Sequence, residues 1–317
     1  MCLFPRLIDN PKYKSTKKNG GIIPPIFDER VKSVPIGCGK CIECTKQKAN
    51  NWRIRLLEEI KTEKGIFVTL SFTDEQWLRI QKMTDKKGYD LDNHIATQGM
   101  RWFLENYRKK HKKSIRHWAI TELGQKNSER IHIHAILFNV TEKDVTENWL
   151  YGNTFTGTYV NEKTVNYIVK YLSKIDKLHK GYRPTILCSA GIGSKYTDTT
   201  AFKRHKYNGK ETDEKYRTRQ GKQLGIPIYY RNKAFTEEER EKLWIHKMDE
   251  KVRYVLGQKI DISVTEKEYR ILLRQAQITN YELGFDKPLT WEEDQYERER
   301  RILKQREIIN KRIRKGK

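Results

Sequence analysis

The sequence predicts an α+β fold, in which an antiparallel sheet carries helices mainly on one face. Runs of β-branched and aromatic residues at 66–72, 115–123 and 131–138 are typical of strands. The segments between and after these runs show helix start signals and apolar residues at helical spacing. The resulting order, strand–helix–helix–strand–strand–helix–strand–helix, fits an antiparallel α+β plate.

The first strand and the two helices after it have clear local signals. Gly65 precedes the strand at 66–72, and Thr73 with Gln76 forms a capping box that begins a short helix. The second helix is expected to present one apolar face, formed by Ile95, Trp102, Phe103 and Tyr107.

The next two strands, 115–123 and 131–138, are expected to form a hairpin. The stretch between them, 124–130, is polar and rich in turn-forming residues. A helix at 141–150, a strand at 154–160 and a helix at 164–175 complete the predicted domain.

The chain divides into three regions by composition. Residues 1–50 are rich in Lys, Pro, Gly and Cys, which predicts an irregular module packing on the core. Residues 51–234 hold the α+β domain. Residues 235–317 are charged and helical, because one helix start signal recurs there at Thr236, Thr265 and Thr290.

The charge of the chain predicts its partners. Its 317 residues contain 65 Lys and Arg against 41 Asp and Glu, a net charge of +24 with a pI near 9.7. Such a protein binds polyanions through counterion release, so nucleic acid is the expected partner. A basic structural or ribosome-associated protein is the alternative. No run approaches the roughly 20 apolar residues that span a bilayer, so we expect an intracellular protein without a membrane partner.

A His-x-His pair is the most informative motif. His132 and His134 lie two apart on a predicted strand, so their side chains share one face. Glu122 on the preceding strand could add a carboxylate ligand. Two imidazoles and one carboxylate leave positions open for phosphate oxygens and suit Mn²⁺ or Mg²⁺. The alternative is a pair of solvated histidines.

A pair of tyrosines follows on a predicted helix. Tyr167 and Tyr171 lie one helical turn apart and so share a face, and each precedes a lysine by three residues, Lys170 and Lys174. Tyrosine can form covalent phosphodiester intermediates, and a nearby lysine can steady a phosphate or phenolate. The alternative is an amphipathic helix whose tyrosines face the core.

The cysteines suggest a second metal site. Cys38, Cys41 and Cys44 are three residues apart, and Cys2 could complete a structural zinc site of four thiolates. An iron–sulfur cluster and reduced thiols are the alternatives. Cys188, in an apolar stretch, is expected to be a packing residue.

Two basic stretches are candidate surfaces for single-stranded DNA. One is at 108–113, and the other, 203–219, also contains Tyr207 and Tyr216 as aromatic platforms. Solvated loops are the alternative. The candidate contacts are Arg108, Lys109, Lys110, Lys203, Arg204, Arg217 and Arg219.

These motifs together resemble the HUH endonucleases in order and spacing. Residues 67–72 look like the first strand motif of that class. Residues 38–44, with Trp52 and Arg55, are similar to the N-terminal signature of replication initiators from gokushovirus-type Microviridae. Several further segments resemble motifs of the same family: 122–124, 130–134, 189–193 and 227–230.

The resemblance covers roughly residues 1–235 and implies a fold and an activity. The fold would be an HUH-type, ferredoxin-like (RRM-like) sheet. The activity would be metal-dependent nicking and joining of single-stranded DNA at a bacteriophage replication origin, through a 5′-phosphotyrosine. The setting would be the cytoplasm of a bacterial host, with host helicase or polymerase as further partners. The alternatives are a non-catalytic, zinc-stabilised nucleic-acid-binding protein, and an HUH plasmid initiator, transposase or relaxase.

Overall fold

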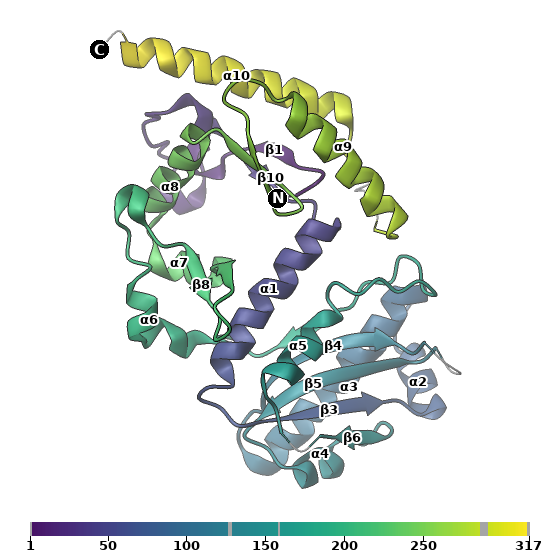
Figure 1. The fold of residues 1–317 in the computed structure, drawn as a ribbon. Helices are drawn as coiled ribbons and strands as arrows, with labels where there is room; N and C mark the ends of the chain where they lie inside the picture. Colours follow the sequence, from purple (N-terminus) through teal and green to yellow (C-terminus); the bar gives the residue numbers. More distant parts are fainter. Residues whose placement is uncertain (1, 126–128, 158, 286–290, 316–317) are drawn as a thin grey trace. The chain divides into compact units, whose positions relative to one another are not determined.

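The computed structural model describes residues 2–125, 129–157, 159–285 and 291–315. The chain forms two compact units (Figure 1). The sheet unit comprises Lys48–His205 and Glu214–Arg231, and the terminal unit comprises Met1–Gln47, Lys206–Asp213 and Asn232–Lys317. The structure therefore groups the N-terminal module with the C-terminal helices.

A five-stranded antiparallel sheet forms the centre of the sheet unit, in the order β6-β3-β5-β4-β7. The antiparallel sheet is confirmed, and the ends of the 131–138 strand agree with the prediction residue for residue. The strands are β3 (Gly65–Ser71), β4 (Arg116–Leu123), β5 (Ile131–Phe138), β6 (Thr154–Thr156) and β7 (Ile186–Cys188).

The central strand β5 buries both of its faces, because its side chains alternate between two apolar clusters. Ile133 and its neighbours at every second position pack in one cluster with Ile95 and Phe103. Ile136 packs in the other with Leu56 and Ile168.

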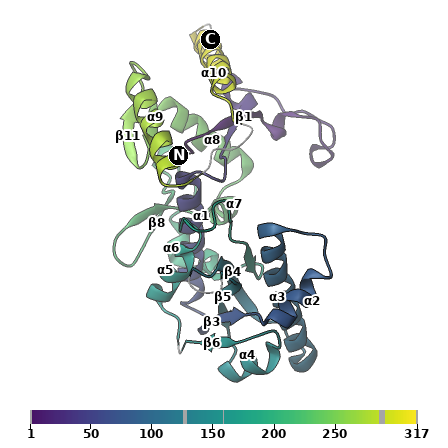
Figure 2. The same ribbon diagram turned by 90° about the vertical axis from the view of Figure 1, so that its right-hand side faces the viewer.

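Helices cover both faces of the sheet, so the expectation of helices mainly on one face was wrong (Figure 2). One face carries α3, and the other carries α5 and the later part of α1. The sequence does not reveal this, because an amphipathic helix can pack on either face of a sheet. The helices of this unit are α1 (Ile42–Glu59, which begins in the terminal unit), α2 (Asp74–Gln81), α3 (Gly88–His111), α4 (Glu142–Asn148), α5 (Glu162–Lys170), α6 (Thr200–Lys203) and α7 (Ile228–Ala234).

Local signals placed most helix starts correctly. Thr73 and Thr141 cap α2 and α4 through their hydroxyl groups. Helix α5 starts two residues before the predicted position and ends at Lys170, so residues 171–175 lie beyond it. Within the expected strand 154–160, β6 covers only Thr154–Thr156. Residues 126–128 of the expected 124–130 turn lie outside the described part of the chain.

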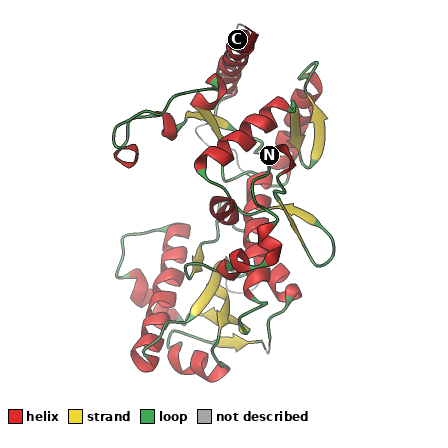
Figure 3. Ribbon diagram, turned by 90° about the vertical axis from the view of Figure 1, so that its left-hand side faces the viewer, coloured by secondary structure: helices red, strands yellow, loops and turns green. Residues whose placement is uncertain are grey.

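The terminal unit combines hairpins and helices. The β10–β11 hairpin lies beside α9 (Figure 3), and Ile260 and Leu273 from these elements share an apolar cluster with Leu3 and Phe4. Its elements are β1 (Arg6–Asp9), β2 (Ser33–Ile36), α8 (Glu237–Asp249), β10 (Val252–Val255), β11 (Gln258–Asp261), α9 (Lys267–Glu282) and α10 (Glu293–Lys315).

The three predicted C-terminal helices are present. Thr236 forms its capping box with Glu239 at the start of α8. Glu266, not Thr265, is the N-cap residue of α9, and it makes no side-chain cap there. Thr290 lies outside the described residues. Among the described helices, none has both the length and the apolar character needed to cross a bilayer.

Candidate metal centre and tyrosine pair

Three metal-ligating side chains meet on one face of the β4–β5 hairpin. Glu122 is directly opposite His132 in the ladder, and His134 follows two residues along the same face. The Oε2 atom of Glu122 lies 2.8 Å from Nε2 of His134 and 3.2 Å from Nε2 of His132. The two Nε2 atoms are 3.2 Å apart. The register therefore brings together the three residues that the sequence singled out as ligands.

The other nitrogen of each ring fixes which atom faces the centre. Nδ1 of His132 lies 3.2 Å from the carbonyl oxygen of Arg130. Because a carbonyl only accepts, Nδ1 carries the proton and Nε2 of a neutral ring keeps its lone pair. Nδ1 of His134 lies 3.0 Å from the Thr69 hydroxyl, which can accept in the same way.

The donor set fits a divalent cation. Two imidazole lone pairs and one carboxylate oxygen converge, and their ligand atoms lie within 4.8 Å of one another. Outer hydrogen bonds of this kind orient metal-bound histidines in proteins. Three such acceptors facing each other have no proton to share when both rings are neutral, whereas a cation satisfies all three.

The charges at the centre also favour a cation. Burial alone would raise the pKa of Glu122, but hydrogen bonds from His132, His134 and Lys174 outweigh it and hold the pKa well below its usual range. Burial lowers the pKa of His134. Glu122 is therefore an anion and His134 a neutral ring at pH 7, which is the state in which each binds a metal ion.

Both tyrosines face this centre from α5 and the residue after it. The Tyr171 hydroxyl donates to the Tyr167 hydroxyl at 2.6 Å. The Tyr171 ring stacks on His134 at 4.7 Å between centroids, and the Phe67 ring stacks on the same imidazole at 5.7 Å. Tyr171 is half-buried, whereas 49 % of Tyr167 is exposed. The tyrosines therefore do not face the core, as the amphipathic-helix alternative requires.

The two lysines differ. Lys174 Nζ donates to Glu122 Oε1 at 2.7 Å and lies over the Tyr171 ring. Lys170 is exposed, and no ion pair links it to Glu122 among the described residues. The structure therefore brings Lys174, and not Lys170, into the centre.

Sequence reasoning missed Thr69 and Phe67. Both lie on β3, and Thr69 is directly opposite His134 in the ladder. The strand had been recognised, but not its pairing with β5. Only that register shows that its alternate residues, 67 and 69, share the face of the histidines.

The candidate DNA-binding residues lie on several elements of the sheet unit. Lys109 and Lys110, near the end of α3 with Arg108, form ion pairs with Glu105 and Glu147. The others are exposed and belong to α6 or follow it, or lie in or after β8 (Lys215–Arg217), which pairs with β9 (Gln223–Gly225): Lys203, Arg204, Arg217 and Arg219.

Two residues were misassigned. Tyr216, expected to be an aromatic platform, is buried, and its hydroxyl donates to Glu58. Cys188, expected to pack in the core, is exposed on the edge strand β7. In both cases the local sequence gives the residue type but not the side of the element that faces solvent.

Other residues that carry the family resemblance form a structural contact in the sheet unit. The Arg55 guanidinium lies between the rings of Trp52 and Tyr229 and donates to the Ile192 carbonyl at 2.9 Å. Gly193 donates to Glu59 at 2.6 Å. These contacts hold the loop at 189–193 against α1 and make no contact with the triad.

Comparison with known proteins agrees with the site. Residues 65–176 match a family of replication-associated proteins, described by the name ORF2. The match runs from β3 to just beyond α5 and includes the triad and both tyrosines. It supports a replication-initiator role of the Rep type and is consistent with nuclease activity on DNA. No curated protein and no solved structure matches the chain.

Proposed function

We propose that the protein is a metal-dependent, sequence-specific nickase and strand transferase of the HUH class, acting on single-stranded DNA. One observation carries the proposal: a tyrosine ring stacks on a ligand of a two-histidine, one-carboxylate centre. Oxygen and imidazole ligands with open positions suit an ion that also binds phosphate.

His132, His134 and Glu122 would hold Mn²⁺ or Mg²⁺. The cation, when bound, supplies positive charge that polarises the scissile phosphate. Thr69 and the Arg130 carbonyl hold the two imidazoles in the tautomer that the ion requires.

A tyrosine oxygen then forms a bond to phosphorus while the bond from phosphorus to the 3′ oxygen breaks. The phenol proton ends on that 3′ oxygen, leaving a free 3′-hydroxyl and a 5′-phosphotyrosine. No phosphodiester energy is lost, because the covalent intermediate keeps an activated phosphate for later joining.

The two tyrosines suit two successive cuts. Tyr171 stacks on His134 and lies close to Glu122, so it is the better placed nucleophile for the first cut. Tyr167 is within hydrogen-bonding distance of it and is more exposed. A second cut by Tyr167 after one round of synthesis would release a unit-length circle.

This chemistry would initiate and terminate rolling-circle replication. The free 3′-hydroxyl would be the primer for a host polymerase, and the basic surfaces would hold the single strand. We assign the origin to a bacteriophage of the gokushovirus type, on the motifs at 38–44 and 189–193.

The test is formation of a covalent adduct. The protein is incubated with Mn²⁺ and labelled single-stranded circles carrying candidate origins, and denaturing gels show whether label stays with the protein. We expect an adduct that a chelator prevents and that the double variant Tyr167→Phe/Tyr171→Phe does not form.

The double variant separates catalysis from binding. It should retain DNA binding, since each substitution removes one hydroxyl group. Tight binding without any adduct by the wild-type protein would instead favour a non-catalytic nucleic-acid-binding protein. An adduct that survives the double substitution would assign the nucleophile to another residue.

A further inference from the structure

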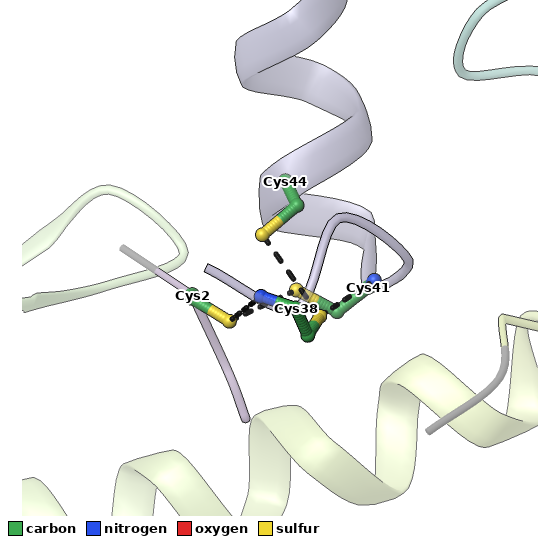
Figure 4. A group of neighbouring side chains, drawn as sticks. All are labelled: Cys2, Cys38, Cys41 and Cys44. Carbon is green, nitrogen blue, oxygen red and sulfur yellow. Dashed lines mark hydrogen bonds between the residues drawn. The ribbon is translucent and has the colours of Figure 1, made fainter. Parts of the chain in front are cut away.

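We propose that Cys2, Cys38, Cys41 and Cys44 bind one structural zinc ion in the terminal unit, independently of the proposed nickase activity. The four side chains converge from two parts of the chain (Figure 4). Cys2 belongs to the N-terminal segment, and Cys44 lies in the first turn of α1. All four are free thiols.

The sulfur positions match a tetrahedral site. Cys38 Sγ and Cys44 Sγ are 3.9 Å apart, and Cys41 Sγ and Cys2 Sγ are 4.0 Å apart. All four sulfur atoms lie within 4.8 Å of one another. With Zn–S bonds of about 2.3 Å, the edge of a regular tetrahedron is about 3.8 Å. One ion at the centre would therefore reach all four sulfurs with little movement.

Backbone N–H groups already point at the sulfur atoms. Cys2 Sγ accepts from the N–H of Phe4 at 3.3 Å and of Cys38 at 3.2 Å. Cys38 Sγ accepts from the N–H of Lys40 at 3.4 Å and of Cys41 at 3.2 Å. Such bonds offset the negative charge of metal-bound thiolates. They also show that the turn at 38–41 is folded around Cys38 Sγ.

The geometry favours a single ion over the other uses of four cysteines. A disulfide needs sulfur atoms about 2.05 Å apart, roughly half the distances seen here. An iron–sulfur cluster places several metal and sulfide atoms between its thiolates, so its ligands stand further apart than one ion allows. Four thiolates select zinc and leave no position open for substrate, so the site is structural.

The site joins segments that build the core of the terminal unit. Leu3 and Phe4, directly after Cys2, are 1 % exposed, and Cys41 is fully buried in the same cluster. Gln277 of α9 donates to the Leu3 carbonyl at 2.8 Å. Asn280, also of α9, accepts from the Ile42 N–H at 2.9 Å.

The ion would therefore fix the N-terminal segment and the start of α1 as one surface on which α9 packs. A small core of this kind is marginal without a further constraint, and a structural metal is one of the usual solutions. Loss of zinc should release α9 as well as the N-terminal segment.

The first test is zinc content and its dependence on particular residues in the full-length protein. We expect about one zinc per chain in the wild type and in His132→Ala/His134→Ala. Zinc should fall to near zero in Cys38→Ser/Cys41→Ser and stay unchanged in the matched control Cys188→Ser, whose thiol is exposed. Unchanged zinc in the Cys38→Ser/Cys41→Ser variant would overturn the proposal, and so would loss of zinc in the histidine variant.

A second measurement uses the wild type alone, in case the cysteine variants fail to fold. Zinc is exchanged for Co²⁺, and the absorption spectrum is recorded. Four thiolates around Co²⁺ give sulfur-to-cobalt charge-transfer bands and strong visible bands of tetrahedral cobalt. A weak octahedral spectrum, or the brown chromophore of an iron–sulfur cluster in the purified protein, would overturn the assignment. Neither result depends on DNA cleavage.

Discussion

At the scale of single residues, the most telling side chain is one that the sequence analysis passed over. Thr69 contacts neither the proposed cation nor DNA, yet its hydroxyl lies 3.0 Å from Nδ1 of His134. It thereby sets which nitrogen of that ring faces Glu122. Metal affinity should depend on this contact, because outer hydrogen bonds fix the tautomer and orientation of a ligand.

Thr69→Val should therefore weaken Mn²⁺ binding by about 10- to 100-fold, the usual cost of losing an outer-shell partner. Valine keeps the shape of threonine and removes only the hydrogen bond. Thr69→Ser, which keeps the hydroxyl, is the control and should bind nearly as well as the wild type. Titration calorimetry with Mn²⁺ measures both, and equal affinity of Thr69→Val and wild type would contradict the assigned role.

The two tyrosines should be unequal in the first cut. Tyr171→Phe should lower the rate of adduct formation on a single-stranded oligonucleotide by at least about 1,000-fold, as loss of a nucleophile does. Tyr167→Phe should keep most of the first cut and lose the release of circles. Gel assays of adduct and of circle release separate the two steps. The reverse pattern would make Tyr167 the first nucleophile.

At the scale of elements, the loop that holds α1 depends on one glycine. Gly193 has φ +76°, and a Cβ built there would lie 2.5 Å from the Tyr230 hydroxyl and 2.6 Å from the Arg55 carbonyl oxygen. Neither atom can withdraw freely, because Tyr230 is buried and the carbonyl belongs to α1.

Gly193→Ala should therefore destabilise the sheet unit by about 3 kcal/mol, the sum of overpacking and left-handed strain. Gly221→Ala is a matched control, since φ is +78° and nothing lies within 4 Å of the added Cβ. It should cost only about 1 kcal/mol. Urea unfolding of the two variants gives the comparison, and equal losses would show that the close contacts relax.

A buried ion pair makes the terminal unit sensitive to acid. Asp28 accepts from the Arg30 guanidinium at 2.7 Å and from the Asn310 amide of α10. Burial alone would raise the pKa of Asp28, but the bonds from Arg30 and Asn310 outweigh it and lower the pKa. The carboxylate therefore stabilises the fold above its ordinary pKa of about 3.9, and this contribution is lost as pH falls through the lower folded value.

Asp28→Asn should thus destabilise the terminal unit by about 3 kcal/mol at pH 7, as removal of one partner from a buried pair does. The difference from wild type should shrink as the pH falls below about 4. Hydrogen exchange of α10, compared between the two proteins at pH 7 and near pH 3, reports the effect locally. A difference that grows toward low pH would contradict the sign.

At the scale of the whole molecule, charge should dominate affinity for DNA. With +24 on 317 residues, binding to single strands should weaken steeply as salt rises, in proportion to the phosphates contacted. Fluorescence anisotropy with a labelled oligonucleotide, between roughly 50 and roughly 200 mM salt, gives the slope. A flat profile would argue against a surface that reads phosphates.

The sequence predicted what depends on local order and missed what depends on pairing across the chain. Alternation gave β5 residue for residue, and the capping signals of Thr73 and Thr141 gave the starts of two helices. The short edge strand β7 was missed, since three residues carry too little periodicity.

For the candidate site, the motifs supplied His132, His134, Glu122 and the tyrosines, because each motif lies within one strand or one helical turn. Thr69 and Phe67 required the β3–β5 register. The buried position of Tyr216 required a contact with Glu58, 158 residues earlier in the chain. Such contacts are set by the packing of whole elements, which no short pattern encodes.

The β4–β5 hairpin has a consequence for synthesis on the ribosome. All three proposed ligands come from one hairpin, in which Glu122 and His134 are separated by only 12 residues. Contacts this local form early, well before distant segments meet. The tyrosine segment is translated some thirty residues later, as the sequence order requires. A nascent chain would therefore acquire its ion-binding corner before it carries any nucleophile, and could not cut DNA until α5 had left the ribosome.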